Sequence, residues 1–383
     1  MPKPTNPNLV HIIPAAVLLI VLTLGSMFVL AGCRAETSET EQTELINGTL
    51  YQLQNGRFAV PPNAGQPSSA PLQYWTVQQR VSDLVTLGGE VYLGVNGHGI
   101  AELILDAAGT VSFNYFYDPL IFRYRTLTTL IPEPGPDRDS LLCHLYFNRI
   151  LNVVSQRELK LQGISLLRLT PSSGIYEFCT PPFQEEHPDW EAVGFVPVTP
   201  REFYLQWKYS DSNRTLFSYS HFDLAGRKEE EVEALVYRKS YGFVNAQETS
   251  VLRLLLAEAR RRLDASGIST AYQLHIRCED RPLLRRYEYH PDDFTSAEEI
   301  RLYTLSGVCR GEFYLLLLPD GLLLQGSSGS RQIQRFRLPP LPEGYVYTGL
   351  LLHERNLVAG WEQTAFTQVG AAGIFFATIA FFP

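Results

Sequence analysis

The sequence predicts an all-β protein. From residue 49 onward, apolar and aromatic runs of about five to nine residues alternate with turn clusters such as Gly88-Gly89, Asn96-Gly97 and Pro319-Asp320-Gly321. Short runs rich in β-branched and aromatic residues, bounded by such clusters, are typical of strands. The body should therefore consist of many short strands in series.

The composition excludes several classes of protein. The chain has 383 residues, of which 45% are hydrophobic, 12% aromatic and 19% charged. This is enough apolar surface for a large core, and it excludes a disordered chain, a collagen-like rod and a coiled coil. The 32 basic and 40 acidic side chains give a net charge of -8. Because nucleic-acid binding depends on a basic surface, this balance argues against a nucleic-acid partner.

Two segments repeat the same hairpin pattern. One has a strand at Val193–Val198, a turn at 199–202 and a second strand at Phe203–Lys208. The other has a strand at Thr348–Leu352, a turn at 353–356 and a second strand at Leu357–Glu362. A glycine precedes a tryptophan by 13 residues in the first (Gly194, Trp207) and by 12 in the second (Gly349, Trp361). A repeated hairpin is typical of an architecture built from similar sheets.

Further copies suggest how many such sheets there are. Leu84–Leu87 with Val91–Asn96, and Leu305–Val308 with Phe313–Leu318, repeat the pattern without tryptophan. The centres of the second strands recur at intervals of about 40 to 70 residues, at Leu93, Leu205, Leu315 and Val358, with weaker candidates at His144 and Gln273. These intervals predict a β-propeller of six or seven blades, and a pair of β-sandwich domains is the alternative.

The two ends of the body should meet in one sheet. The apolar run from Gly373 to Phe382 is too short for a membrane helix and is typical of a buried strand. In propellers the last strand commonly pairs with an early one, and Thr49–Val60 is available for that pairing.

One amphipathic helix is predicted among the strands. Leu252, Leu255, Leu256, Ala259 and Leu263 fall on one helical face. Arg260, Arg261 and Arg262 lie on its flank and outward face, with Glu258 four residues before Arg262. Such a partly balanced set of arginines could touch anionic lipid but is more often a solvated face, which is the interpretation we adopt here.

The N-terminus carries a targeting pattern. Lys3 is followed by an apolar run from Ala15 to Leu24 and then by Leu30-Ala31-Gly32-Cys33. This resembles a bacterial lipoprotein signal peptide with its lipobox. The resemblance implies that residues 1–32 are removed and that Cys33 carries acyl chains such as palmitate, which anchor the protein in a membrane. An uncleaved transmembrane helix over Ile12–Leu30 is the alternative.

The same resemblance implies a location in the cell envelope. In the best-known sorting system an Asp after the cysteine retains a lipoprotein at the inner membrane, and Arg34 stands there instead, which favours the outer membrane. Residues 33–48 are rich in Glu, Thr, Ser and Gln, so we expect a flexible tether. The globular body is then residues 49–383.

Four cysteines remain in the predicted body: Cys143, Cys179, Cys278 and Cys309. In an oxidising compartment they permit two disulfides, with three possible connectivities. All four lie in or beside apolar runs, so buried free thiols are the alternative. Their spacing lacks the close pairs of a zinc site.

No catalytic residue, metal site or cofactor is predicted. Glu185 to His187 and His290 to Asp293 contain possible metal ligands, but both adjoin prolines and are typical of solvated turns. Ser210 to Phe217 has the outline of the Asp-box of sialidase-like propellers, with Ser212 in place of its Asp and Arg214 in place of its Gly.

These observations predict a function only in outline. We expect a lipid-anchored envelope protein that acts as a non-catalytic scaffold for an envelope protein partner, and a subunit of an assembly machine is a related possibility. The alternative is a carbohydrate-binding or hydrolase propeller that uses its central channel.

Overall fold

The computed structural model describes most of the predicted body. It covers residues 43–60, 80–106, 109–122, 125–133, 139–147, 165–197, 202–224, 226–239, 246–264, 270–278, 281–289, 301–364 and 371–380. Residues 1–42, including Cys33, lie outside this set, as do His290 to Asp293.

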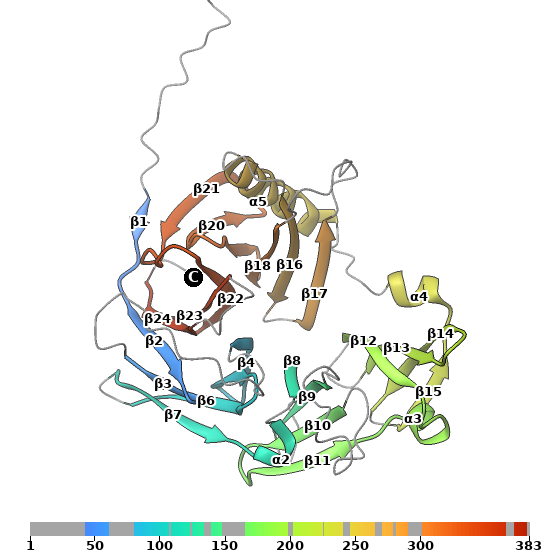
Figure 1. Ribbon diagram of the computed structural model, residues 1–383. Coiled ribbons are helices and arrows are strands. Elements are labelled where there is room, and N and C mark those ends of the chain that lie inside the picture. The colour runs from blue at the N-terminus through green and yellow to red at the C-terminus, as the bar shows by residue number, and fades with distance from the viewer. Residues whose placement is uncertain are drawn as a thin grey trace, which may run out of the picture. The chain divides into compact units, whose positions relative to one another are not determined.

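The described chain is mostly β, in five sheets (Figure 1). Three of them are four-stranded antiparallel meanders. Sheet I contains β4 (Val81–Leu87), β5 (Glu90–Val95), β6 (Gly99–Leu105) and β7 (Val111–Phe116). Sheet II contains β8 (Arg125–Glu133), β9 (Ser140–Phe147), β10 (Ser165–Thr170) and β11 (Ile175–Cys179). Sheet III contains β12 (Glu191–Pro197), β13 (Glu202–Ser210), β14 (Thr215–Asp223) and β15 (Lys228–Glu231).

The other two sheets join distant parts of the chain. Sheet IV has the order β1 (Glu44–Leu45), β21 (Ser330–Arg337), β20 (Leu322–Ser327), β19 (Phe313–Leu317), β18 (Arg301–Arg310), β16 (Thr270–Cys278) and β17 (Arg281–Tyr289). Its β1–β21 and β16–β18 pairs are parallel. Sheet V has the order β22 (Tyr345–His353), β23 (Asn356–Gln363), β24 (Ala372–Thr378), β2 (Thr49–Gln54) and β3 (Arg57–Ala59).

The repeated hairpins are confirmed, each as an adjacent antiparallel pair of strands within one sheet. The two tryptophan-containing copies are β12–β13 and β22–β23, and the other two are β4–β5 and β18–β19. The predicted pairing of the two ends of the body is also confirmed. β2 and β24 are antiparallel, with Thr49 opposite Phe376 at one end of the pairing and Gln52 opposite Gly373 at the other. Gln273 lies in β16, which opens no meander.

A β-bulge recurs in the opening hairpin of four sheets. The register of the first strand shifts by one residue at Ser82, Thr128, Val193 and Thr348. In sheets III and V the residue after the bulge is the glycine of the repeated pattern, and the residue before the bulge pairs with the tryptophan. A bulge increases local twist and frees a backbone group, and the carbonyl of Thr348 accepts a hydrogen bond from the Ser306 hydroxyl of β18 at 2.8 Å. The bulge at Thr348 therefore helps to join sheet V to sheet IV.

Each sheet packs against the next through a separate apolar cluster. One cluster lies between sheets IV and V, the next between V and I, the next between I and II, and the next between II and III. In β9, for example, Leu141 and Cys143 face sheet I while Leu142 faces sheet III. Because successive residues of a strand point to opposite faces, strands buried on both faces have continuous apolar runs rather than alternating ones.

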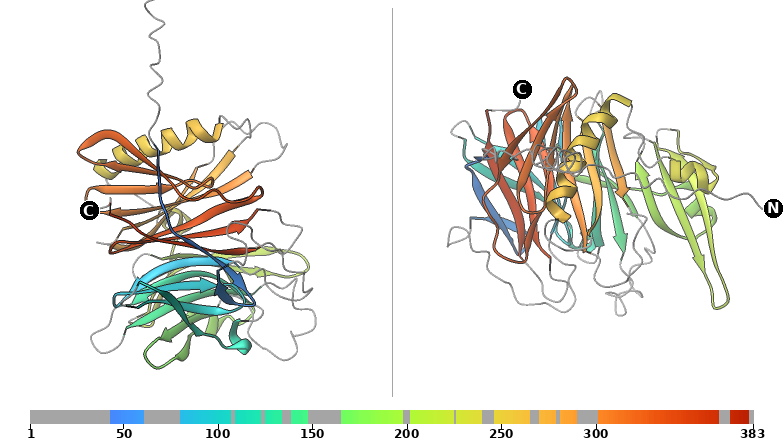
Figure 2. Two further views of the ribbon diagram at one scale, coloured as in Figure 1. Left: turned by 90° about the vertical axis from the view of Figure 1, so that its left-hand side faces the viewer. Right: turned by 90° about the horizontal axis from the view of Figure 1, so that it is seen from above.

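The predicted amphipathic helix is confirmed as α5 (Ala246–Asp264) and covers one face of sheet IV (Figure 2). Val251, Leu252, Leu255 and Ala259 are buried against apolar residues of β18, β19 and β20. The prediction of a single helix was wrong, because short helices also connect strands: α2 (Pro119–Phe122), α3 (Pro182–Glu186) and α4 (Ala234–Lys239). These are one or two turns long and carry too few residues for a periodic signal. Among the described helices none is long and apolar enough to cross a membrane.

The compact unit begins at Glu44, earlier than the predicted start at Thr49. Ile46 is buried in the cluster between sheets IV and V, and its amide donates to the Arg337 carbonyl at 2.9 Å. Two apolar residues, Leu45 and Ile46, in a polar segment give no local strand signal. The end of the predicted tether is therefore part of the body.

The two repeated tryptophans offer a matched test of core hydrogen bonding. Both are fully buried, but Trp207 Nε1 donates to Ser220 Oγ at 2.7 Å, whereas Trp361 Nε1 has no hydrogen-bond partner among the described residues. Trp207→Phe should therefore lower the free energy of unfolding by about 1 kcal/mol more than Trp361→Phe does. Urea unfolding of both variants measures this, and equal losses would contradict the assignment.

Candidate functional site

The outward side of α5 is basic. With Val251, Leu252, Leu255 and Ala259 turned toward the sheet, the helical period places Arg253 and Arg260 on the opposite side, where both are exposed. Arg261 and Arg262 follow on the flank that faces β21. The face that the sequence predicted to be polar is thus the face that the packing leaves in solvent.

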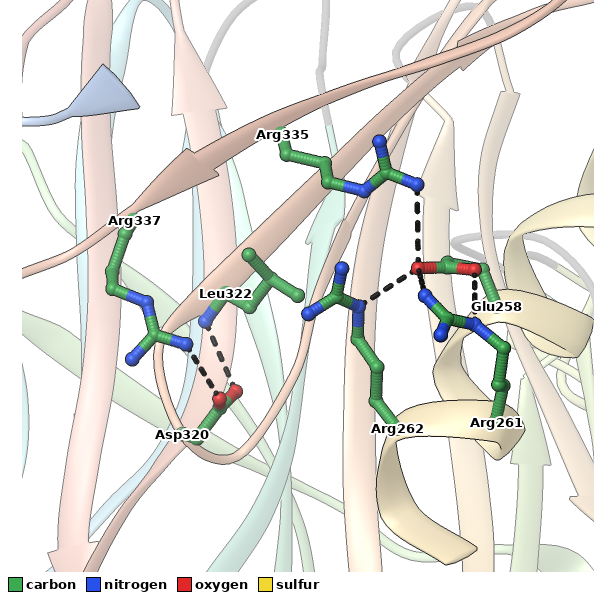
Figure 3. A network of polar contacts seen from close by, with 7 residues as sticks. All are labelled: Glu258, Arg261, Arg262, Asp320, Leu322, Arg335 and Arg337. Atoms are coloured by element: carbon green, nitrogen blue, oxygen red, sulfur yellow. Dashed lines mark hydrogen bonds and ion pairs between the residues drawn. The ribbon is translucent and has the colours of Figure 1, made fainter. Parts of the chain in front are cut away.

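One carboxylate gathers arginines from two elements (Figure 3). Glu258 accepts from Arg261 Nη2 at 2.9 Å and from Arg262 Nε at 2.8 Å within α5. Arg335 Nη2 of β21 approaches the same oxygen, Oε1, at 3.4 Å. The Glu258 side chain is only 12% exposed. These contacts hold the three guanidinium groups around one carboxylate.

The electrostatics of Glu258 reflect this surrounding charge. Burial by itself raises the pKa of Glu258, but hydrogen bonds and charge from Arg261 and Arg262 outweigh burial and lower the pKa to about 2. The carboxylate therefore stays ionised through the physiological range and holds the arginines in place.

The strand β21 extends the basic side chains beyond the helix. Arg335 and Arg337 share one face of β21 with Ile333, and Ile333 packs against the cluster under α5. Arg331 is exposed near the start of the strand, where the β20–β21 register is irregular. Arg337 Nη2 contacts Asp320 Oδ2 at 3.0 Å, and Asp320 Oδ1 accepts the Leu322 amide at 3.1 Å. We call the combined surface the arginine face: Arg253, Arg260, Arg261 and Arg262 of α5, with Arg331, Arg335 and Arg337 of β21.

The N-terminal part of the body joins the sheet at this same strand. β1 pairs in parallel with β21, with Glu44 opposite Phe336 and Leu45 opposite Arg337. Position 44 is the first residue of the compact unit. The chain that leads from Cys33 therefore reaches the body next to the arginine face.

The four cysteines of the body fall into two kinds. Cys309 is disulfide-bonded, and Cys278 lies directly opposite it in the β16–β18 register. Cys143 and Cys179 are free thiols. Cys143 is fully buried, and burial raises the pKa of its thiol; burial likewise raises the pKa of Cys179. A raised pKa disfavours the reactive thiolate, so these two side chains serve in packing.

Two of the stretches considered for metal binding or sugar chemistry lie within the described residues, one in a short helix and one in a hairpin turn. Glu185 and Glu186 end α3, and no group of three or more potential metal ligands occurs in the described part of the chain. The Asp-box-like stretch is the β13–β14 turn, in which Asp211 Oδ1 accepts the amides of Asn213 and Arg214 at 2.8 and 2.9 Å. Such an acceptor closes a hairpin without any ligand.

A buried carboxylate that the sequence did not single out also has a structural role. Glu229 Oε2 accepts the Phe183 amide at 2.6 Å, and Glu229 Oε1 accepts from the Ser220 hydroxyl. Burial raises the pKa of Glu229, although these hydrogen bonds oppose the rise. Its acceptors bind α3 to sheet III, which accounts for its burial.

The sequence missed the contribution of β21 to the arginine face. The sequence signal that could have revealed these arginines is their spacing, because residues two or four apart lie on the same side of a regular strand. Nothing in that spacing shows that α5, about 70 residues earlier in the chain, lies beside them, since only tertiary packing brings the two together.

Comparison with known proteins places the chain in a family. Residues 40–380 match DUF8086, a family of unknown function. The chain belongs to the DUF8086 family. No curated protein matches it.

Solved structures give distant similarities. A mutant of Trypanosoma rangeli sialidase displaying trans-sialidase activity is 10% identical, with 88% of this chain and 58% of that chain covered and a TM-score of 0.39. Saccharomyces cerevisiae Sqt1 is also 10% identical, with 88% and 70% covered and a TM-score of 0.24. Both of these neighbours are β-propeller proteins. The DUF8086 chain spans just over half the length of the sialidase.

Glu258→Gln should destabilise the DUF8086 protein at neutral pH by about 1 kcal/mol, because it removes the charge that holds Arg262 and Arg335 in partly buried positions. The pKa of Glu258 is lowered from 4.5 to about 2, so its contribution is complete above about pH 4.5 and is lost as the pH falls toward 2.

Urea unfolding at several pH values measures this effect. The parent protein should lose stability between about pH 4.5 and pH 2 more steeply than the Glu258→Gln variant. Glu343→Gln, at an exposed glutamate, is the matched control and should leave stability unchanged. Parallel pH profiles for the parent and Glu258→Gln would contradict the role of Glu258.

Proposed function

We propose that this DUF8086 protein is a lipid-anchored protein of the bacterial cell envelope, whose β-propeller body is a non-catalytic scaffold for a protein partner. The observation that carries the proposal is the junction of β1 with the edge of sheet IV, where the chain that follows the lipobox becomes part of a compact body. A short tether then separates Cys33 from Glu44. Its ten residues reach about 35 Å when fully extended.

The way in which the sheets pack one against the next supports the proposed propeller fold. Sheets V, I and II bury both faces against their neighbours, whereas a β-sandwich buries one face of each sheet. In sheet IV, β18 to β21 form a meander like the others, and the β16–β17 hairpin is added in parallel. We interpret that hairpin as part of a further blade. The total is then six blades, within the range of six or seven that the repeat predicts.

Exposed apolar residues on a projecting hairpin support the scaffold. β13 and β14 each contain nine residues, paired from Glu202 with Asp223 to Ser210 with Thr215. Near the tip Leu216 is 39% exposed and Phe217 is 52% exposed. Leu216 and Phe217 are adjacent in β14 and point to opposite faces of the hairpin, so a partner that encloses the tip would contact both. The alternative, a carbohydrate-binding or hydrolase propeller, remains a second proposal.

The lipid anchor is tested by Cys33→Ser. The parent protein should carry a diacylglycerol-modified cysteine as its first residue and remain in the membrane fraction, because two or more acyl chains anchor a protein stably. The variant should lack the lipid mass and leave the membrane after a salt wash. Cys179→Ser, at a free thiol of the body, is the matched control and should stay anchored. An intact N-terminus in the parent protein would refute the anchor.

The scaffold is tested at the projecting hairpin. The paired change Leu216→Ser with Phe217→Ser should abolish the stoichiometric partner that cross-links to and co-purifies with the parent protein from detergent-solubilised envelopes. The expected loss is at least tenfold, since truncated anchor residues each cost more than about 1 kcal/mol. Leu235→Ser with Val236→Ser changes an exposed apolar pair on α4 and is the control. Equal recovery of the partner with both variants would contradict the assignment.

A further inference from the structure

We propose that the arginine face binds the headgroups of anionic phospholipids and lays the body on the bilayer that anchors it. The inference rests on the proposed lipid anchor, but its physical basis is a surface of the folded body. Arg253, Arg260, Arg261 and Arg331 are exposed on that surface, and the Arg337 side chain is 41% exposed.

The charge of this face contrasts with the rest of the chain. α5 and β21 together contain seven arginines, no lysine and three acidic residues, in a chain whose net charge is -8. The remainder is therefore more acidic than the chain as a whole. An anionic bilayer attracts the arginine face and repels the other surfaces.

Arginine is suited to this ligand. Its planar guanidinium donates two parallel hydrogen bonds to the oxygens of a phosphate and is less strongly hydrated than an ammonium group. Glu258 holds Arg261, Arg262 and Arg335 at fixed distances from 2.8 to 3.4 Å. Less side-chain entropy is then lost when a headgroup binds.

The position of the face relative to the tether completes the argument. Leu45 pairs with Arg337, so the lipidated end of the chain is attached beside the arginines. A tether of about 35 Å keeps that edge of sheet IV near the lipid surface. Attachment raises the effective concentration of headgroups at the face, so even weak individual contacts contribute to binding.

Vesicle flotation with the body alone tests the inference. Glu44–Pro383 is a compact unit that contains every apolar cluster of the described chain, so residues 34–383 can be used without the lipid. The body should float with phosphatidylcholine vesicles containing about 30% phosphatidylglycerol and not with phosphatidylcholine alone. Raising the salt from about 0.1 M to 0.5 M should release it.

The decisive comparison is between two variants with the same change in charge. Arg253→Gln with Arg260→Gln and Arg331→Gln should weaken binding about a hundredfold, since each arginine near an anionic surface contributes about fivefold. The control, Arg57→Gln with Arg227→Gln and Arg355→Gln, changes exposed arginines elsewhere on the body and should stay within about threefold of the parent. The corresponding Arg→Lys variant of the face keeps the charge and should retain most of the binding.

Several outcomes would overturn the inference. They are equal weakening by both glutamine variants, flotation that does not depend on phosphatidylglycerol, and release of the body by millimolar inorganic phosphate, which would indicate a site for free phosphate. Because the tested protein lacks Cys33, a failure here leaves the lipid anchor intact. Loss of the anchor in the Cys33→Ser experiment would in turn leave vesicle binding by the body unchanged.

Discussion

The architecture depends on burying both faces of its central sheets. Strands such as β5 and β9 have apolar residues at odd and even positions alike, so a sheet built from them needs a partner on each side. Stacking sheets in succession satisfies this need, but it leaves the first sheet of the series with one uncovered face. In sheet IV that face is covered by α5, whose apolar stripe replaces a neighbouring sheet. The helix is therefore a consequence of the stacking, and its outward arginines are exposed for the same reason.

Local signals predicted the elements of the fold well, and long-range signals were mostly absent. The hairpins around Trp207 and Trp361, and the helix α5, were visible because turn residues and hydrophobic periodicity act over a few residues. The parallel pairs β1–β21 and β16–β18 were not visible, since the partners are separated by many residues and β1 contains only Glu44 and Leu45. The β2–β24 pairing was predicted because the ring closure of a propeller requires it.

Only the helical part of the candidate site was predicted from the sequence. Arg260, Arg261 and Arg262 of α5 were identified, but they were interpreted as a solvated face because Glu258 and Asp264 partly balance them. The strand β21 adds Arg331, Arg335 and Arg337, of which Arg337 contacts Asp320. Sequence spacing could place these residues on one side of a strand, yet their proximity to α5 depends on how both elements pack on sheet IV. The net charge of α5 alone therefore underestimated the net charge of the surface that α5 and β21 form together.

The acidic character of the whole chain and the basic character of the arginine face act together. A tether attached at a random point would let an acidic body rotate freely and be repelled from an anionic bilayer. Under the proposed lipid anchor the tether would join at β1, beside Arg337, so the arginine face would be the surface held closest to the lipid. Repulsion of the remaining surfaces then favours the same orientation as attraction of the arginine face. In that proposed orientation the arginine face would contact the bilayer, and the other surfaces would stay accessible to the proposed protein partner.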